Sequence, residues 1–523
     1  MSVINDMSKK GILSSKLFWI LVAVALFLLL QIPLTNYLVD DAYIHLTFAR
    51  NIATGNGFSF NPREPTYGVT APLWTLLMAP LSLLFGAQPF IAKIVSTVFG
   101  ALTIPLIFRL GRRFGLQATS VIGVTLAWGV NLWLVRWSAS GMETSLAILL
   151  LMLAFNDQLQ GRSTAGIWLG FSVLTRPETI IIAVIFALDR WRIQGLKKAL
   201  ETVSLFLLAS LPWQLYAWVT FGTVTPNPAQ VKSGGFFPHL PDLLLGFKRA
   251  VGVLLASSSW EVIVIAAAVF LLWHKSKKIV DEKEHETLIP VSLPNEDSVV
   301  SARKLALLIV WAVFPPVVFL SREVFIQSRY LIIAIPAVLI GGFLAFDTLE
   351  RQGRRLFNKS TRFVLIGLIM CQNLLLSVIL TYPHARLFQE TTDALTELST
   401  YLREHTPAGS SVAVGDVGLI GFYSHRYVID VEGLVTQQMI PIRALMTQED
   451  LIASEIYWSI KRPDYVIDIS TMPDRLCTLP EVGSHYREVI RIPITGALIG
   501  GNRDIRYYTL YKVVMENTSK EIQ

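Results

Sequence analysis

The residues best suited to chemistry are two adjacent carboxylates that follow the first apolar run of the chain. Asp40 and Asp41 come directly after a run that extends from Leu17 to about Leu34. Two neighbouring carboxylates at an apolar boundary do not readily both ionise unless a cation lies near. One is therefore a candidate general base for a hydroxyl group, and the other is a candidate to orient the acceptor or to hold a metal ion. The alternative is a pair that only caps a helix beginning near Ala42.

More polar side chains stand where other apolar runs end. Glu143 lies at a hairpin turn, and Arg176 and Glu178 lie at the tip of two unusually short runs. Charged groups are costly at membrane depth, so such positions indicate a binding site. Lys232 and Arg329 lie at the same predicted level, where a cation suits the phosphate of a membrane lipid. The helix dipole, a local ion pair or snorkelling of a single cation explains each of these residues equally well.

The composition indicates which kind of chain must position these residues. Of 523 residues, 53% are hydrophobic and only 16% are charged. Soluble proteins are about 25% charged, so the bilayer is the expected main solvent. The net charge of +7 does not indicate nucleic acid, because the basic residues cluster in short loops between apolar runs, as the positive-inside rule requires. Cys371 and Cys477 stand in different environments, and neither a disulfide nor a metal-ligand spacing is expected.

The apolar runs predict about eleven membrane-crossing helices in the inner or plasma membrane. The segment 71–86 is short and contains Pro72 and Pro80, so we interpret it as a helix lying in the outer interface. The first run is a retained helix with a cytoplasmic N-terminus, because a basic segment precedes it and no cleavage site follows. The predicted crossings are about 17–38, 90–110, 117–136, 143–157, 164–175, 179–190, 199–217, 254–273, 305–320, 331–346 and 362–382.

Two domains follow from this pattern. Residues 1–385 form a polytopic α-helical membrane module, with an outer loop at 39–89 and a cytoplasmic loop at 274–304. Residues 386–523 form a mixed α/β domain outside the cytoplasm, because an odd number of crossings precedes it. Its predicted elements are a helix at Thr391–His405 and strands at Ser411–Val414, Tyr427–Val431, Asp464–Ile469 and Tyr507–Val513.

Taken in order, the motifs resemble those of bacterial type C glycosyltransferases, most closely the branch of the terminal arabinofuranosyltransferases. The resemblance covers most of the chain. It runs through Asp40–Ile44, Arg50–Asn51, Tyr67–Gly68, Ser140–Thr144, Thr175–Glu178, Pro226–Asn227 with Lys232, Arg329–Tyr330, Asp416–Phe422 and Ile429–Leu434. Two positions depart from the family pattern. His45 stands where small or polar residues are more usual, and Pro228-Ala229-Gln230 follows the Pro226–Asn227 element.

The resemblance implies a fold of the GT-C type and an inverting transfer of a sugar, such as arabinofuranose or mannose. The donor would be a polyprenyl-phosphate sugar, and the acceptor an extracytoplasmic glycan, lipid or cell-envelope polymer. Asp40 and Asp41 would be catalytic. No cofactor is implied, although a divalent cation near the aspartates stays open. The implied substrate-binding residues are Tyr43, His45, Arg50, Tyr67, Glu143, Arg176, Glu178, Lys232, Arg329 and Tyr330.

Two other functions compete with transfer. A transporter or flippase for lipid-linked sugars predicts two related halves and polar groups near mid-membrane. A non-catalytic envelope-assembly protein predicts that the Asp40–Asp41 pair tolerates substitution. The charges gather at one predicted face and no halves repeat, so the sequence favours the enzyme.

Overall fold

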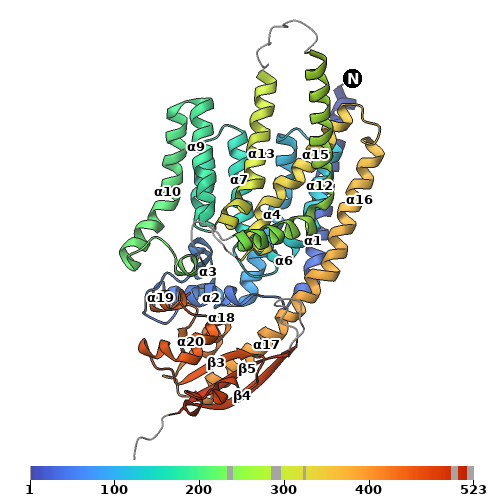
Figure 1. Ribbon diagram of the computed structural model, residues 1–523. Coiled ribbons are helices and arrows are strands. Elements are labelled where there is room, and N and C mark those ends of the chain that lie inside the picture. Colours follow the sequence, from blue (N-terminus) through green and yellow to red (C-terminus); the bar gives the residue numbers. More distant parts are fainter. Residues whose placement is uncertain (1, 233–239, 284–295, 322–324, 496–504, 515–523) are drawn as a thin grey trace, which may run out of the picture.

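The computed structural model describes residues 2–232, 240–283, 296–321, 325–495 and 505–514. A bundle of long helices fills one end of the molecule, and a domain with a β-sheet lies at the other (Figure 1). The N-terminus lies at the end of the bundle that is far from the sheet (Figure 1). One continuous cluster of buried apolar side chains runs from the bundle into the sheet domain, so the two parts share a core.

Seven helical segments are long and apolar enough to cross a membrane, and a bent pair of helices makes an eighth candidate, among the described residues. The bent pair is α5 (Ala118–Gly129) and α6 (Leu132–Ser138), with 46° between their axes. A helix occupies most of each of the eleven predicted segments, but the number of crossings and their direction stay predictions. The other bundle helices are α1 (Ser2–Gln31), α4 (Pro89–Arg113), α7 (Thr144–Leu159), α8 (Ala165–Val173), α9 (Ile180–Gln194), α10 (Leu196–Phe221), α12 (Leu240–Lys283), α13 (Glu296–Ser321), α14 (Ser328–Leu331), α15 (Ile335–Arg351) and α16 (Lys359–Leu376).

The predicted cytoplasmic loop at 274–304 is largely helical where the structure describes it. Helix α12 continues to Lys283 and α13 begins at Glu296, and residues 284–295 between them lie outside the described ranges. The predicted domain boundary at residue 385 falls within α17 (Tyr382–His405), which leads from the bundle into the sheet domain (Figure 1).

Two short helices fill the predicted outer loop and lie between the bundle and the sheet domain (Figure 1). They are α2 (Asp40–Ala53) and α3 (Pro72–Phe85), which pack against each other. The chain between them folds back on α2, because the Asn51 amide donates to the carbonyls of Ser59 at 2.9 Å and Phe60 at 2.8 Å. The helix expected at 71–86 is present as α3, and its place in the outer interface stays a prediction.

The C-terminal domain is a five-stranded mixed sheet with the order β2-β1-β3-β5-β4. β1 pairs in parallel with β2 and β3, whereas β5 pairs antiparallel with β3 and β4. The four predicted strands are present. β4 was not predicted, because it is an edge strand in which charged residues interrupt the apolar ones. The elements are β1 (Ser411–Val414), α18 (Val417–Ser424), β2 (Tyr427–Asp430), α19 (Ile440–Arg443), α20 (Gln448–Ser454), β3 (Tyr465–Ser470), α21 (Arg475–Thr478), β4 (Tyr486–Thr495) and β5 (Ile505–Val513).

Candidate active site

Helix α2 borders a cavity of about 390 Å³ between the bundle and the sheet domain. Asp41, Ile44 and His45 line it. Residues three and four positions apart lie on the same face of an α-helix, so this spacing turns all three side chains to one side. Segments far away in the sequence complete the walls: the turn before α7, the start of α9, the end of α13, α14, the six-residue helix α11 (Asn227–Lys232) and Leu434 of the sheet domain.

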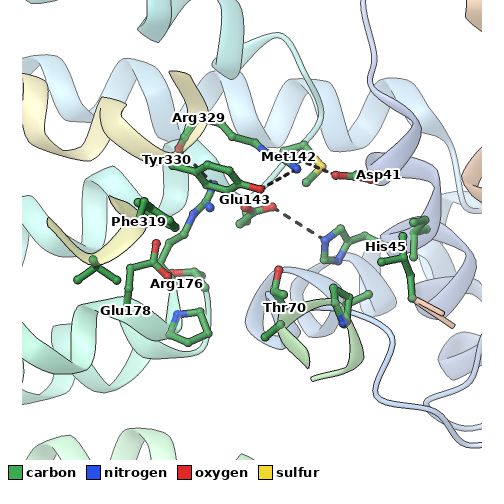
Figure 2. A pocket seen from close by; sticks show the side chains of 18 of the residues that line it. Asp41, His45, Thr70, Met142, Glu143, Arg176, Glu178, Phe319, Arg329 and Tyr330 are labelled. Carbon is green, nitrogen blue, oxygen red and sulfur yellow. Dashed lines mark hydrogen bonds and ion pairs between the residues drawn. The ribbon is translucent and has the colours of Figure 1, made fainter. Parts of the chain in front are cut away.

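Asp41 forms an ion pair with Arg329, which lies on α14. The Arg329 Nη1 atom is 2.6 Å from Asp41 Oδ2, and Arg329 Nη2 donates to the Tyr330 hydroxyl at 3.2 Å. The Arg329 guanidinium also lies 5.1 Å from the centre of the Tyr330 ring. Its cationic head is therefore held at the cavity wall beside the carboxylate (Figure 2).

A second ion pair, between Arg176 and Glu143, forms the adjoining wall. Arg176 Nη2 lies 2.9 Å from Glu143 Oε1, and both side chains are buried. Arg176 precedes Pro177, which disfavours a helical backbone at the residue before it, and its φ of −146° is extended. This break between α8 and α9 turns the guanidinium inward. Gly141, with φ of +74°, allows the tight turn that brings Glu143 beside α2.

The two guanidiniums share Tyr330 and keep unused hydrogen-bond donors. Arg176 lies 5.4 Å from the Tyr330 ring, and that ring stacks on Phe319 at 4.6 Å. Within the described residues, the Nε atoms of Arg176 and Arg329 are buried and donate no hydrogen bond. Two cations with spare donors in one cavity suit an anion such as phosphate.

His45 faces Glu143 from the other side of the cavity (Figure 2). His45 Nδ1 is 2.7 Å from the Thr75 hydroxyl, and His45 Nε2 is 3.9 Å from Glu143 Oε2. Burial lowers the pKa of His45 below its ordinary value, more than the nearby carboxylate of Glu143 raises it. The imidazole is therefore neutral at pH 7. Glu178 contributes a further carboxylate to the wall.

The wall formed by α9 and α13 is apolar. Ile180, Ile181, Val318 and Phe319 line it. Ile180 and Ile181 are also 49% and 40% exposed, so this wall reaches the outer surface of the helix bundle. The cavity thus joins a charged wall to an apolar wall that continues outside, an arrangement that fits a ligand with a phosphate head and an apolar chain.

Solved structures of membrane proteins share this architecture. ArnT from Cupriavidus metallidurans, bound to undecaprenyl phosphate, aligns with a TM-score of 0.56 at 14% identity over 94% of this chain and 98% of ArnT. The oligosaccharyltransferase of Archaeoglobus fulgidus in its apo form aligns with a TM-score of 0.53 at 13% identity over 91% of this chain and 73% of that protein. The chain has the GT-C fold.

The same oligosaccharyltransferase, AglB, in complex with an inhibitory peptide and a dolichol-phosphate aligns with a TM-score of 0.53 at 12% identity, covering 97% of this chain and 75% of AglB. Residues 385–511 match a family model described as a domain of unknown function, DUF8728. A search of curated protein sequences finds no match. The expected GT-C-like fold with a C-terminal α/β domain is confirmed, whereas the arabinofuranosyltransferase branch stays a prediction.

Three predicted site residues lie on a different face of α2 and contact α18. The Asp40 carboxylate accepts from the backbone N–H of Gly418 at 2.9 Å and of Leu419 at 2.8 Å. Arg50 donates to the Phe422 carbonyl at 2.7 Å. The Tyr43 ring packs against the rings of Phe422 and Tyr423. Asp40, Tyr43 and Arg50 therefore dock the sheet domain rather than line the cavity, in contrast to the expectation from the sequence.

Burial of Asp40 in this contact raises the pKa of its carboxyl to about 8, and the nearby charge of Asp416 raises it further than Asp41 does. Asp416 itself accepts from the Tyr508 hydroxyl at 2.5 Å, and burial raises the pKa of Asp416 as well. Burial and the neighbouring charge of Asp416 therefore favour the protonated form of Asp40 near neutral pH.

Tyr67 lies behind the cavity wall. Its hydroxyl accepts from the Trp213 indole at 2.7 Å, its ring stacks on Phe221, and its carbonyl accepts from the Asn227 N–H at 2.9 Å. Lys232 ends α11, and its side chain lies outside the described part of the chain. Among the described residues no group of three His, Cys, Asp or Glu side chains is placed to hold a metal ion. The expectations for Lys232 and for a cofactor stay predictions.

The structure brings together seven of the predicted residues: Asp41, His45, Glu143, Arg176, Glu178, Arg329 and Tyr330. Two features of the site were not predicted: Thr75, which is hydrogen-bonded to His45, and the apolar wall of Ile180, Ile181 and Phe319. The position of Ile180 and Ile181 directly after the Arg176–Glu178 motif is a signal that was available. Thr75 gives no such signal, because its role depends on how α3 packs against α2.

Proposed function

We propose that this chain is an inverting glycosyltransferase that moves a sugar from a polyprenyl-phosphate donor to a hydroxyl group of an extracytoplasmic glycan, lipid or envelope polymer. One observation carries the proposal: a single cavity combines Asp41, two buried guanidiniums and an apolar wall that reaches the outer surface of the bundle. The undecaprenyl phosphate bound to ArnT and the dolichol-phosphate bound to AglB support the class of donor.

Arg329 and Arg176 bind the donor phosphate in this proposal. When the bond between the anomeric carbon and the phosphate oxygen breaks, the oxygen keeps the electron pair and the lipid phosphate gains negative charge. Fixed cations with unused N–H donors stabilise that charge more than they stabilise the bound substrate, and this difference lowers the barrier. The apolar wall at Ile180 and Ile181 takes the first part of the lipid chain.

Asp41 acts as the general base. The acceptor oxygen attacks the anomeric carbon from the face opposite the phosphate, and its proton passes to the Asp41 carboxylate, so the configuration at that carbon inverts. The donor phosphate competes with Asp41 for Arg329, which frees the carboxylate for the acceptor. We assign this role to Asp41 rather than Asp40, because each Asp40 oxygen already accepts a backbone hydrogen bond from α18.

The finer assignments rest on the family resemblance for the sugar and on the distribution of basic residues for the topology. The sugar is arabinofuranose or mannose, and the membrane is the inner or plasma membrane, with the N-terminus in the cytoplasm and the sheet domain outside. The position of the N-terminus at the far end of the bundle from the sheet domain supports this arrangement (Figure 1).

The test uses the full chain in lipid nanodiscs, first with decaprenyl phosphate alone. Arg329→Gln and Arg176→Gln should each weaken binding about 10-fold or more, because each removes a charge-assisted contact to the phosphate. Arg136→Gln is the matched control, since Arg136 is hydrogen-bonded to Tyr37 and His384 and does not line the cavity.

Transfer is then measured with decaprenyl-phosphate arabinofuranose and decaprenyl-phosphate mannose. Absence of both binding and turnover contradicts the proposal and favours the assembly role, whereas movement of the carrier across proteoliposomes without transfer favours a flippase.

A further inference from the structure

His45 and Glu143 leave a gap in the cavity wall that is too wide for a direct hydrogen bond. Their facing atoms, His45 Nε2 and Glu143 Oε2, are 3.9 Å apart. A hydrogen bond between nitrogen and oxygen needs about 2.7–3.2 Å. The two side chains are nevertheless only 5% and 4% exposed, so bulk water does not freely solvate the facing atoms.

Each side chain is held from behind, which leaves one atom of each directed at the cavity. His45 Nδ1 is bonded to the Thr75 hydroxyl at 2.7 Å, and Glu143 Oε1 is paired with Arg176 at 2.9 Å. Among the described residues, Glu143 Oε2 is buried and accepts no hydrogen bond. A buried carboxylate oxygen without a donor is unfavourable, so this atom favours a ligand that supplies a hydrogen-bond donor.

The geometry of the gap selects the kind of group. An oxygen atom about 2.8 Å from both facing atoms lies off the line that joins them, on the cavity side, and the two contacts meet at roughly a right angle. When the Thr75 hydroxyl donates to Nδ1, the neutral His45 ring carries its proton on Nε2. Nε2–H then donates, and Glu143 Oε2 accepts. Only a group that both accepts and donates satisfies the two atoms, and a hydroxyl does so.

We propose that His45 and Glu143 form a subsite that binds one hydroxyl group of a sugar and thereby determines which sugar the cavity takes. The inference rests on the proposed function, because the other oxygen of Glu143 is paired with Arg176, to which we assign the donor phosphate. A hydroxyl held there belongs to a sugar next to the reacting bond. The donor ring is the first candidate, and the acceptor ring is the other source of the same chemistry.

The test measures binding to the full chain in nanodiscs without any acceptor. The probes are decaprenyl phosphate, its arabinofuranose and mannose conjugates, and the single-deoxy analogues of whichever conjugate binds more tightly. In the wild type, one deoxy analogue should bind about 10- to 100-fold more weakly than its parent, because its absent hydroxyl leaves both protein atoms unpaired. In His45→Phe, the parent and that analogue should bind equally, while decaprenyl phosphate binds as in the wild type.

His45→Gln and Thr75→Val refine the assignment. A glutamine places an N–H group near the position of Nε2 and should restore part of the discrimination. Thr75→Val removes the hydroxyl that orients the ring with little change in shape, and should reduce discrimination without affecting the binding of decaprenyl phosphate. The deoxy series in the wild type needs no substitution, so the test stands even if a variant does not fold.

The outcomes separate the two proposals. Equal binding of every deoxy analogue to the wild type, or discrimination that persists in His45→Phe, overturns the donor-hydroxyl subsite. If deoxy acceptors, supplied as methyl glycosides of the same sugar, instead raise KM in the wild type and not in His45→Phe, the subsite holds and the hydroxyl belongs to the acceptor. If the wild type binds neither decaprenyl phosphate nor its conjugates, the proposed function itself fails and the subsite falls with it.

Discussion

The adjacent residues Asp40 and Asp41 lie on two different faces of helix α2. The two faces differ in how many of their polar atoms, and of the atoms that they contact, form hydrogen bonds. On the face toward α18, both Asp40 oxygens accept backbone N–H groups and Arg50 donates to backbone carbonyls. On the face toward the cavity, Asp41 and His45 meet partners whose bonding is incomplete: within the described residues, Glu143 Oε2 and Arg329 Nε have no hydrogen bond.

This difference separates a structural contact from a binding site. Folding normally pairs buried polar groups, because an unpaired one costs about 1–3 kcal/mol. The face toward α18, which carries Asp40, Tyr43 and Arg50 and is called the docking face below, follows that rule, since α18 supplies a hydrogen-bond partner to each charged group. The cavity side departs from it, within the described residues, at Glu143 Oε2 and at the Nε atoms of Arg176 and Arg329, and these three residues line one cavity. We infer that the unpaired atoms form hydrogen bonds with a bound ligand. Substitutions on the cavity side should therefore change activity, whereas substitutions on the docking face should change stability.

The largest expected effect comes from separating the two aspartates. Asp41→Asn should lower the rate of sugar transfer by about 10²- to 10⁴-fold, because it removes the general base, while binding of decaprenyl phosphate changes only a few-fold. In Asp40→Asn, the rate of sugar transfer per folded molecule should stay close to that of the wild type. Both rates are measured in nanodiscs with the conjugate that the wild type uses. An equal loss of transfer rate in the two variants would contradict the assignment of Asp41 to catalysis and of Asp40 to docking of the sheet domain.

The next largest effect should come from the docking face at Gly418. A Cβ atom there would lie 2.1 Å from the Asp40 carbonyl oxygen, so α18 has to move away from α2. Gly418→Ala should therefore lower the free energy of unfolding by about 1–3 kcal/mol, although alanine favours the helix. Thermal unfolding in nanodiscs measures the loss. Gly409→Ala is the matched control, because nothing lies within 4 Å of its Cβ position, and a similar loss there would contradict the packing argument.

Arg50→Gln tests the same face with a smaller change. The substitution removes the donors to the Phe422 and Gly421 carbonyls and the contact of the guanidinium with the Phe422 ring at 5.0 Å. We expect a loss of about 1–2 kcal/mol in stability. The affinity for decaprenyl phosphate should stay within about 2-fold of the wild type, because Arg50 does not line the cavity. A large loss of affinity in a stably folded variant would return Arg50 to the substrate site, where the sequence resemblance had placed it.

Much of the molecule could be predicted from the sequence because a membrane-spanning helix has a limited length. Residues that end successive apolar runs lie at similar depths, and this brought Asp41, Glu143, Arg176 and Arg329 into one predicted site. The composition change after Tyr382 likewise revealed the sheet domain. Both inferences depend only on local apolarity and charge.

The rest depended on contacts that local sequence does not encode. Asp40, Tyr43 and Arg50 lie on a second face of α2, and the partner of that face is distant in the sequence: Gly418 is 378 residues from Asp40. Nothing near Asp40 predicts that contact, so the two aspartates were interpreted as one catalytic pair. β4 was missed for a related reason. An edge strand needs apolar residues on one face only, and its charged residues interrupt the pattern.

The smallest expected effect, per pH unit, is a pH dependence of stability that arises from Asp40 and not from Asp41. Burial and Asp416 raise the pKa of Asp40 from 3.8 to about 8, so the docked state holds a proton that the undocked state releases. A group with a raised pKa contributes stability that is present at low pH and is lost as the pH rises through its folded value. The melting temperature should therefore fall as the pH rises from about 5 to about 8, because the free energy of unfolding decreases by at most about 1.4 kcal/mol per pH unit. Asp40→Asn should flatten this slope and Asp41→Asn should keep it, whereas stability that rises over that range would mean that Asp40 is docked as a carboxylate.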